Sequence, residues 1–167
     1  MKRQVSILFT YYEYDSIEDL EKDDRFLTEG AIEAARNAYA PYSHYYVGAA
    51  VRLESGMMLS GTNVENAAFP SGICAERNVV ANAVSNHRND RIEAIAIAAL
   101  TSAGLIEDPV TPCGNCRQVL TEEEVRNGNK IKIILTGVRK IIVIEGVENI
   151  LPLRFNSGNL KATLPLQ

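Results

Sequence analysis

Cys74-Ala75-Glu76-Arg77 is one of the two stretches that decide the fold, and the other is Pro112-Cys113-Gly114-Asn115-Cys116-Arg117. Together they contain all three cysteines of the chain. Three thiolates make a three-ligand zinc site, and the fourth position of such a site stays open for a water. Glu76 follows a cysteine by two places and can carry a proton to and from that position without being a ligand. The two stretches therefore predict an open metal site with its own proton carrier.

Each stretch is predicted to begin a helix, which brings the sulfur atoms together. Thr111-Pro112 is a helix-start signal, a capping hydroxyl followed by a proline in the first turn. Cys113 and Cys116 are then one turn apart on the same helix face, and Cys74 lies at the start of another helix. Three thiolates on Zn²⁺ leave a net negative charge, which two helix dipoles and Arg77 oppose.

The order of predicted strands and helices along the chain indicates an α/β fold. The expected strands are residues 47–53, 57–63, 92–100, 131–135 and 140–144, and the expected helices are residues 25–39, 74–84 and 112–126. Ile92 to Leu100 is a nearly continuous apolar run, which is typical of a strand covered on both faces. Only Thr136 to Arg139 separates the last two strands, so these must be antiparallel, because a parallel crossover needs about a dozen residues. We expect a three-layer α/β/α fold with a five-stranded mixed sheet.

Composition narrows the function classes. The chain has 167 residues and a net charge of −4, so it shows no general electrostatic footprint for nucleic acid. No apolar run reaches membrane-spanning length, and the first five residues make a poor signal peptide. Three cysteines, two of them in CxxC spacing, fit a reducing compartment and a metal. We expect a cytoplasmic protein with neither a nucleic-acid nor a membrane partner.

The chain divides into two predicted parts. Residues 1–23 are an N-terminal arm or extension, and residues 24–167 are the catalytic domain. Within the first part, Gln4 to Tyr14 is rich in β-formers and is predicted to be a strand or an extended arm.

Each motif has a plainer explanation when it is taken alone. A glutamate in a first helical turn, such as Glu76, more often simply favours the helix dipole. Cys74 alone is more often a small buried apolar residue, and the 113–116 pair alone could be a redox pair. A structural zinc site needs a fourth ligand, yet His44 and His87 lie in contexts that suggest a turn and a solvated loop. Together the motifs match C-x-E … P-C-x-x-C, the all-cysteine form of the signature of zinc-dependent base deaminases.

The chain resembles the small homotetrameric cytidine deaminases from about Asp24 to Leu160. The resemblance is carried, in the family's order, by Ala40–His44, Val47–Ala50, Asn63–Ala67, Gly72–Arg77 and Pro112–Gln118. It implies one Zn²⁺ per subunit on Cys74, Cys113 and Cys116, with Glu76 as the proton shuttle. It also implies that Asn63 and Glu65 hold the ribose hydroxyls and that the backbone of Ala75 meets the pyrimidine carbonyl.

The resemblance extends to the C-terminal part and includes departures. Leu151-Pro152-Leu153-Arg154-Phe155 is similar to a family motif whose aromatic residue, here Phe155, reaches a neighbouring subunit's active site. Tyr45, Phe69 and Ser71 stand where the family usually has phenylalanine, tyrosine and leucine. A phenol at Tyr45 can still stack on a base.

The predicted activity is hydrolytic deamination of cytidine or 2′-deoxycytidine by a zinc-bound hydroxide, in pyrimidine salvage. The expected partner is a small nucleoside, and the expected assembly is a homotetramer that shares its active sites. The alternative is deamination of another small cytosine-containing nucleoside, such as a nucleoside antibiotic. Polynucleotide-editing deaminases resemble one another in having a helix between their last two strands, and the short turn at residues 136–139 argues against that class. A non-catalytic zinc domain or a redox protein is the most distant alternative.

Overall fold

The computed structural model describes residues 1–161, so the end of the predicted catalytic domain, residues 162–167, lies outside the described part. The strands are β1 (Tyr12–Tyr14), β2 (Tyr46–Leu53), β3 (Met58–Thr62), β4 (Ile92–Thr101), β5 (Gly104–Leu105), β6 (Lys132–Thr136) and β7 (Ile141–Glu145). The α-helices are α1 (Lys22–Arg36), α2 (Ala75–Asn86), α3 (Gly114–Asn127) and α4 (Gly158–Lys161), and the 3₁₀ turns are η1 (Ile17–Asp19), η2 (Phe69–Ser71) and η3 (Val147–Asn149).

The strands form one mixed sheet in the order β1-β7-β6-β4-β2-β3, with the short β5 beside β4. β4 pairs parallel with β6, and the remaining pairings are antiparallel. The predicted antiparallel pairing of the last two strands is confirmed, with Ile134 opposite Val143. The β4–β6 pair is parallel because α3 supplies the crossover between them.

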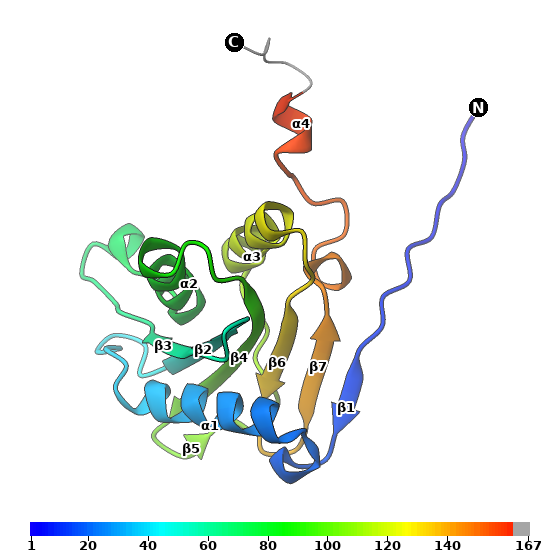
Figure 1. Cartoon of the computed structure of the whole chain (residues 1–167). Coiled ribbons are helices and arrows are strands. Elements are labelled where there is room, and N and C mark those ends of the chain that lie inside the picture. The colour runs from blue at the N-terminus through cyan, green and yellow to red at the C-terminus, as the bar shows by residue number, and fades with distance from the viewer. Residues whose placement is uncertain (162–167) are drawn as a thin grey trace.

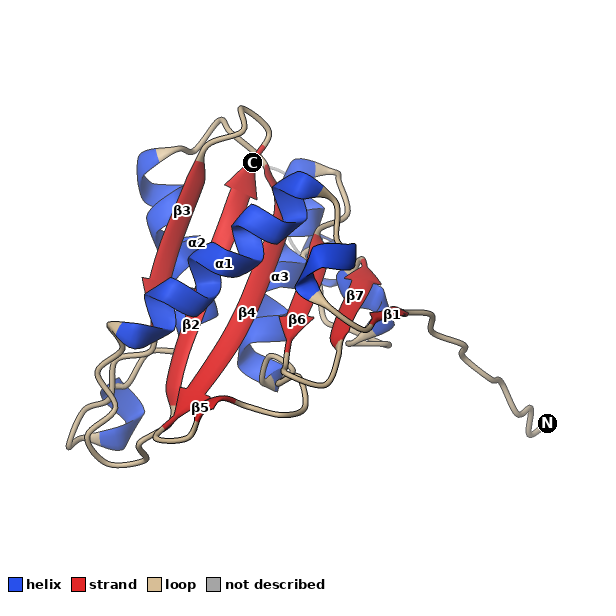
Figure 2. Ribbon diagram, turned by 90° about the horizontal axis from the view of Figure 1, so that it is seen from below, coloured by secondary structure: helices blue, strands red, loops and turns tan. Residues whose placement is uncertain are grey.

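Helices cover both faces of this sheet. Figures 1 and 2 show α1 across one face and α2 and α3 on the other. This is the predicted three-layer α/β/α arrangement. Within the described residues, no helix is both long and apolar enough to cross a membrane.

Alternation along β4 assigns its two faces to different helices. Ala94, Ala96 and Ala98 belong to the core cluster that includes Leu27 and Ala31 of α1. The larger Ile95 and Ile97 belong to the cluster on the opposite face, which includes residues of α2 and α3. Successive side chains of a strand point to opposite faces, so a run that is apolar throughout is the pattern of a strand buried on both sides.

Two strand glycines let helices approach the sheet closely. A Cβ at Gly48 in β2 would lie 2.1 Å from the carbonyl oxygen of Ala31 and 2.4 Å from the amide nitrogen of Ala35, both in α1. A Cβ at Gly61 in β3 would lie 2.8 Å from the amide nitrogen of Val79 in α2. Helix α2, which begins next to Cys74, therefore packs directly against the backbone of β3.

The prediction of five strands is wrong, because β1 and β5 also belong to the sheet. β1 is the last part of the predicted strand or arm, and it pairs with β7 more than a hundred residues away, so that Tyr12 lies opposite Val143. β5 has two residues, too few to show a strand period. The sequence indicated an extended segment at β1 but not its distant partner, and β5 is too short to leave a local signal.

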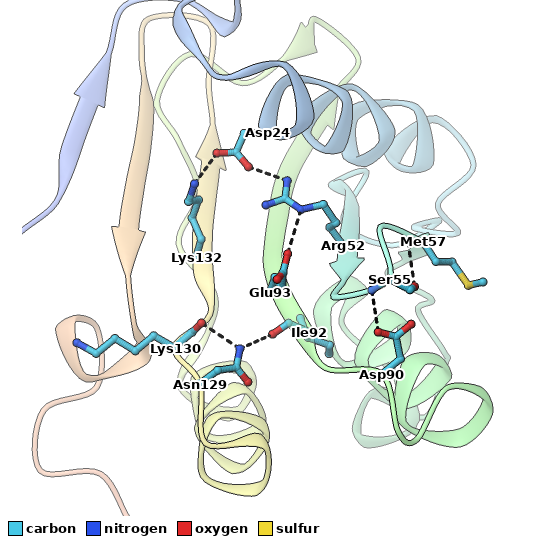
Figure 3. Close-up of polar contacts among 10 residues, drawn as sticks. All are labelled: Asp24, Arg52, Ser55, Met57, Asp90, Ile92, Glu93, Asn129, Lys130 and Lys132. Carbon is cyan, nitrogen blue, oxygen red and sulfur yellow. Dashed lines mark hydrogen bonds and ion pairs between the residues drawn. The ribbon is translucent and has the colours of Figure 1, made fainter.

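Asp24, near the start of α1, ties that helix to two strands. Its carboxylate accepts hydrogen bonds from Nη1 of Arg52 and from Nζ of Lys132, each at 2.8 Å, as Figure 3 shows. Asp24 is buried. A buried charge needs such partners, and these two fix the helix against β2 and β6.

Candidate metal centre

The three cysteine sulfurs meet at one point between α2 and α3. All three Sγ atoms lie within 4.8 Å of one another, and those of Cys113 and Cys116 are 3.4 Å apart. Three sulfurs that bind one Zn²⁺ tetrahedrally at about 2.3 Å lie roughly 3.8 Å apart, so this group fits the ion. Cys116 is buried, Cys74 is half-buried and Cys113 is exposed, which leaves one side of the group open.

Both helices begin at a cysteine of this group. Cys74 is the N-cap of α2, and its carbonyl accepts the first helical hydrogen bond, from the amide of Asn78 at 3.0 Å. Cys113 is the N-cap of α3, and its carbonyl accepts from the amide of Arg117 at 3.0 Å. The predicted cap at Thr111 is therefore wrong by two residues. The positive ends of two helix dipoles converge on the sulfur group, which favours thiolates there.

The surroundings of the sulfurs shift their pKa values in different directions. Burial raises the pKa of the Cys116 thiol, and the neighbouring Glu76 carboxyl raises it further. Burial also raises the pKa of Cys74. Burial alone would raise the pKa of Cys113, but hydrogen bonds from the backbone amides of Cys116 and Asn115 help to outweigh burial, so the pKa of this thiol is lowered. Three adjacent thiols do not all lose their protons without a cation, because three negative charges would repel one another. A dication bound between them would stabilise all three thiolates.

Glu76 lies beside this group in the first turn of α2. It is 6% exposed, and burial raises the pKa of its carboxyl against smaller opposing effects of its own backbone amide and the Cys116 side chain. A carboxyl group with a raised pKa can both accept and return a proton near neutral pH.

A cavity of about 600 Å³ opens over the sulfur group. This volume falls within the range of small-molecule sites. Four predicted site residues line it near the metal centre: Cys74, Ala75, Glu76 and Cys113. Val47, Ile97 and Val110 supply apolar wall, and Phe69 lies at the rim with 73% of its surface exposed.

Asn63 and Glu65 also line the cavity. The side-chain oxygen of Asn63 accepts from the amide of Val47 at 2.8 Å, and its nitrogen donates to the carbonyl of Tyr45 at 2.9 Å. An asparagine amide offers more than these two bonds, so the side chain keeps one N–H and one lone pair for a ligand. The side chain of Asn63, which directly follows β3, is thus held in place by the start of the neighbouring strand β2.

Glu65 is held by two backbone amides of the loop between α1 and β2. Its Oε2 accepts from the amides of Tyr42 at 2.8 Å and Ser43 at 3.2 Å, and its pKa is lowered by hydrogen bonds with Ser43 and the Tyr42 amide. Both backbone amides donate to the same carboxylate oxygen, Oε2. Sequence reasoning missed the supporting role of Tyr42 and Ser43, although both lie inside a stretch that carries the family resemblance.

Four predicted site residues lie outside the residues that line the cavity: the buried Cys116, Tyr45, Phe155 and Arg77. Tyr45 is half-buried, and burial raises its pKa. Phe155 is 57% exposed on the C-terminal segment, where its carbonyl accepts from Nε2 of Gln118 at 2.9 Å. Arg77 is half-buried, and its guanidinium makes no hydrogen bond or ion pair within residues 1–161.

Arg117 is a residue whose role the sequence did not reveal. Its guanidinium donates to the carbonyl of Pro112 at 2.8 Å, to the carbonyl of Ile150 at 2.6 Å and to the hydroxyl of Thr111 at 3.2 Å. These bonds hold the segment before Cys113 against the start of the C-terminal segment. The arginine directly after Cys116 was the available signal, but its partner Ile150 lies 33 residues away in sequence and could not be inferred.

Comparison with known proteins agrees with this geometry. Residues 21–129 match the family described as "Cytidine and deoxycytidylate deaminase zinc-binding region". The chain is 38% identical to a cytidine deaminase of Sporosarcina psychrophila over 128 residues, covering 77% of this chain and 88% of that protein. It is 43% identical over 100 residues to a cytidine deaminase of Halalkalibacterium halodurans, covering 60% of this chain and 71% of that protein.

A solved structure shares the fold. The crystal structure of cytidine deaminase from Burkholderia pseudomallei superposes with a TM-score of 0.66 at 34% identity, covering 78% of this chain and 97% of that one. The matched family region contains both helix starts and all three cysteines. The chain therefore belongs to the zinc-binding cytidine and deoxycytidylate deaminase family.

Proposed function

We propose that the protein catalyses the hydrolytic deamination of cytidine, 2′-deoxycytidine or both, which gives the uridine product and ammonia. The observation that carries this proposal is the meeting of three cysteine sulfurs and one buried glutamate in a cavity of about 600 Å³. No observation favours the alternative of a nucleoside antibiotic as substrate.

Cys74, Cys113 and Cys116 would hold the zinc. When bound, the ion supplies a Lewis acid that lowers the pKa of water to near neutrality. The carboxylate of Glu76 takes a proton from the attacking water and delivers it to N3 of the cytosine ring. It then takes the second proton of that water and passes it to the leaving amino group, so the carboxylate is regenerated. Arg77, on the same helix, is proposed to reduce the net negative charge of the centre.

The remaining cavity residues orient the nucleoside in this proposal. Asn63 offers its free N–H and lone pair to one ribose hydroxyl, and the second oxygen of Glu65 accepts from another. The amide of Ala75 belongs to the first turn of α2, whose N–H groups have no intrahelical acceptor, so it suits the pyrimidine carbonyl oxygen. Tyr45 is proposed to stack on the base.

We also propose that the chain forms a homotetramer in the cytoplasm and works in pyrimidine salvage. Phe155 is exposed on the C-terminal segment and does not line its own cavity, as expected of a side chain that completes a neighbour's site. The free cysteines are consistent with a reducing compartment.

The direct test follows the fall in ultraviolet absorbance as cytidine is converted to uridine. Zinc-loaded protein is expected to deaminate cytidine, chelator-stripped protein to be inactive, and added Zn²⁺ to restore the rate. Full activity in metal-free protein would overturn the proposal. A zinc-dependent protein that turns over no cytosine nucleoside would refute the substrate assignment.

A further inference from the structure

The N-terminal arm, defined here as residues 1–11, is not used by the proposed reaction. Figures 1 and 2 show it running away from the sheet beyond β1. Within the described chain, residues 1–9 make no hydrogen bond, and the arm is attached through the amide of Thr10, which donates to the side-chain oxygen of Asn149 at 3.4 Å. The arm is therefore an extended segment that leaves most of its backbone groups unpaired.

Composition distinguishes this arm from a solvated tail. Residues 4–12 contain no charge, glycine or proline. Leu8 is 95% exposed, and Val5, Ile7 and Phe9 are also exposed. Disordered tails are polar and charged, whereas an uncharged run of β-formers with an open edge is a site for strand pairing.

The arm continues an edge of the sheet. β1 lies at one end of the strand order, and among residues 1–161 it pairs with β7 alone, so its other edge has no partner in this part of the chain. The rings of Phe9 and Tyr11 stack with centroids 6.1 Å apart, as expected when alternate residues of an extended strand share a face. By the same alternation, Val5 and Ile7 share that face.

Charges at the two ends of the segment identify the partner. Lys2 and Arg3 precede the uncharged run, and Glu13 and Asp15 follow it. Two copies aligned antiparallel place the basic end of each beside the acidic end of the other, whereas a parallel alignment places like charges together. A second copy of the same segment is thus the complementary partner.

We propose that the arm pairs antiparallel with the arm of a second copy of this chain, centred on Leu8. In this register Ile7 lies opposite Phe9, Val5 opposite Tyr11 and Arg3 opposite Glu13. The apolar odd-numbered side chains of both arms then share one face.

Neighbouring registers lose either the apolar face that the two arms share or the pairing of Arg3 with Glu13. A shift of one residue places the odd-numbered residues of one arm opposite the even-numbered residues of the other. The apolar side chains of the two arms then lie on different faces of the sheet. A shift of two breaks the pair of Arg3 with Glu13: in one direction Arg3 lies opposite Tyr11, and in the other Glu13 lies opposite the apolar Val5 while Arg3 lies opposite Asp15. The resulting sheet continues from one copy into the next through a two-fold interface. This inference does not rest on the proposed deaminase activity.

A photo-cross-linker tests the contact directly. In the full chain, Phe9→p-benzoylphenylalanine is irradiated and the covalent products are digested with trypsin. The expected product joins two copies of the peptide 4–22, which must come from different chains because each chain contains that peptide once. Cross-links from position 9 to any other peptide, or the absence of a covalent dimer, overturn the proposal.

Charge variants at Leu8 test the register. Residue 8 of one copy lies opposite residue 8 of the other, so Leu8→Asp and Leu8→Lys each bring like charges together and lower the cross-link yield roughly tenfold. Co-expression of the two variants restores the yield, because Asp then lies opposite Lys. Leu8→Asn is the matched control, which loses the apolar side chain without repulsion and keeps an intermediate yield.

The outcomes separate pairing from misfolding. Because Leu8 is 95% exposed within one copy, all three variants are expected to keep the melting temperature of the parent protein at low concentration. The register is refuted if co-expression of Leu8→Asp and Leu8→Lys does not restore the cross-link yield that each variant loses. It is also refuted if Leu8→Asp gives the same cross-link yield as Leu8→Asn.

Discussion

At the scale of single residues, Glu76 shows how the fold sets chemical character. Its place in the first turn of α2 favours the charged form through the helix dipole, yet burial raises its pKa, and burial is the larger effect. A glutamate at the same sequence position on an exposed helix would be an ordinary carboxylate. The tertiary environment makes it suitable for moving protons.

Glu76→Gln is expected to keep zinc and to lower turnover by at least ~100-fold, because the amide neither accepts nor returns a proton. The comparison requires metal analysis of both proteins and steady-state rates on cytidine. Near-normal turnover with full zinc content would remove Glu76 from the proposed mechanism.

Asp24 links stability to pH. Burial raises its pKa, but hydrogen bonds from Lys132 and Arg52 outweigh burial and lower the pKa below its ordinary value of 3.8. The stability it contributes is therefore complete above that value and is lost as the pH falls through the lower folded-state pKa. The pKa of Lys132 is raised above 10.5 by the Asp24 hydrogen bond and charge, which outweigh burial, so its contribution is complete below 10.5 and lost as the pH rises through the higher folded value.

Asp24→Asn is expected to lower the free energy of unfolding at pH 7 by about 2–4 kcal/mol, since two cations lose their anion. The difference from the parent protein should begin to shrink below about pH 4, where the carboxylate of the unfolded parent takes up a proton, and should shrink further until the pH has passed the lower folded-state pKa. Denaturant unfolding at several pH values measures it. A difference that is equal at pH 7 and pH 3 would contradict this account.

At the scale of elements, the seating of α1 on β2 depends on backbone contact. Gly48 lies under α1 where a Cβ has no room, whereas a Cβ at Gly30, within α1, would lie 3.6 Å from Cβ of Ala50 in ordinary contact. The same helix–strand interface therefore contains one glycine that is required and one that is not.

Gly48→Ala is expected to destabilise the protein by about 3 kcal/mol or more, because helix and strand must move apart. Gly30→Ala is the matched control and should stabilise α1 by about 0.5–1 kcal/mol, the usual gain in a helix interior. Thermal unfolding of both variants gives the comparison. If the two substitutions have the same effect, close packing at Gly48 is not what holds α1.

At the scale of the whole molecule, the two exposed ends of the described chain point to association. The C-terminal segment presents Phe155, and the N-terminal arm presents apolar side chains around Leu8. Neither contributes to the cavity of its own chain. The proposed active site and the proposed sheet pairing both become complete between copies.

Mixing two inactive variants tests the shared site. Glu76→Gln lacks the proton carrier, and Phe155→Ala lacks the aromatic side chain proposed to enter a neighbour's site. In a random mixed assembly about a quarter of the sites combine Glu76 from one chain with Phe155 from its neighbour, so activity should return to about that fraction. Activity no greater than the sum of the separate variants would show that Phe155 acts within its own chain.

The sequence by itself determined the metal centre and the layer order. The cysteine spacing predicted the three sulfurs that meet between α2 and α3, because residue types at fixed helical spacing carry that chemistry locally. The apolar run from Ile92 to Leu100 predicted a strand covered on both faces, and the short turn at 136–139 predicted an antiparallel last pair.

Tertiary structure alone decided the features that join distant residues. Three features each depend on segments far apart in the chain: the pairing of β1 with β7, the support of Glu65 by the amides of Tyr42 and Ser43, and the bond of Arg117 to the carbonyl of Ile150. Burial of Glu76 belongs to the same group, since it results from packing around α2. A local pattern records which groups are present, but only the folded chain sets which groups meet and how much water reaches them.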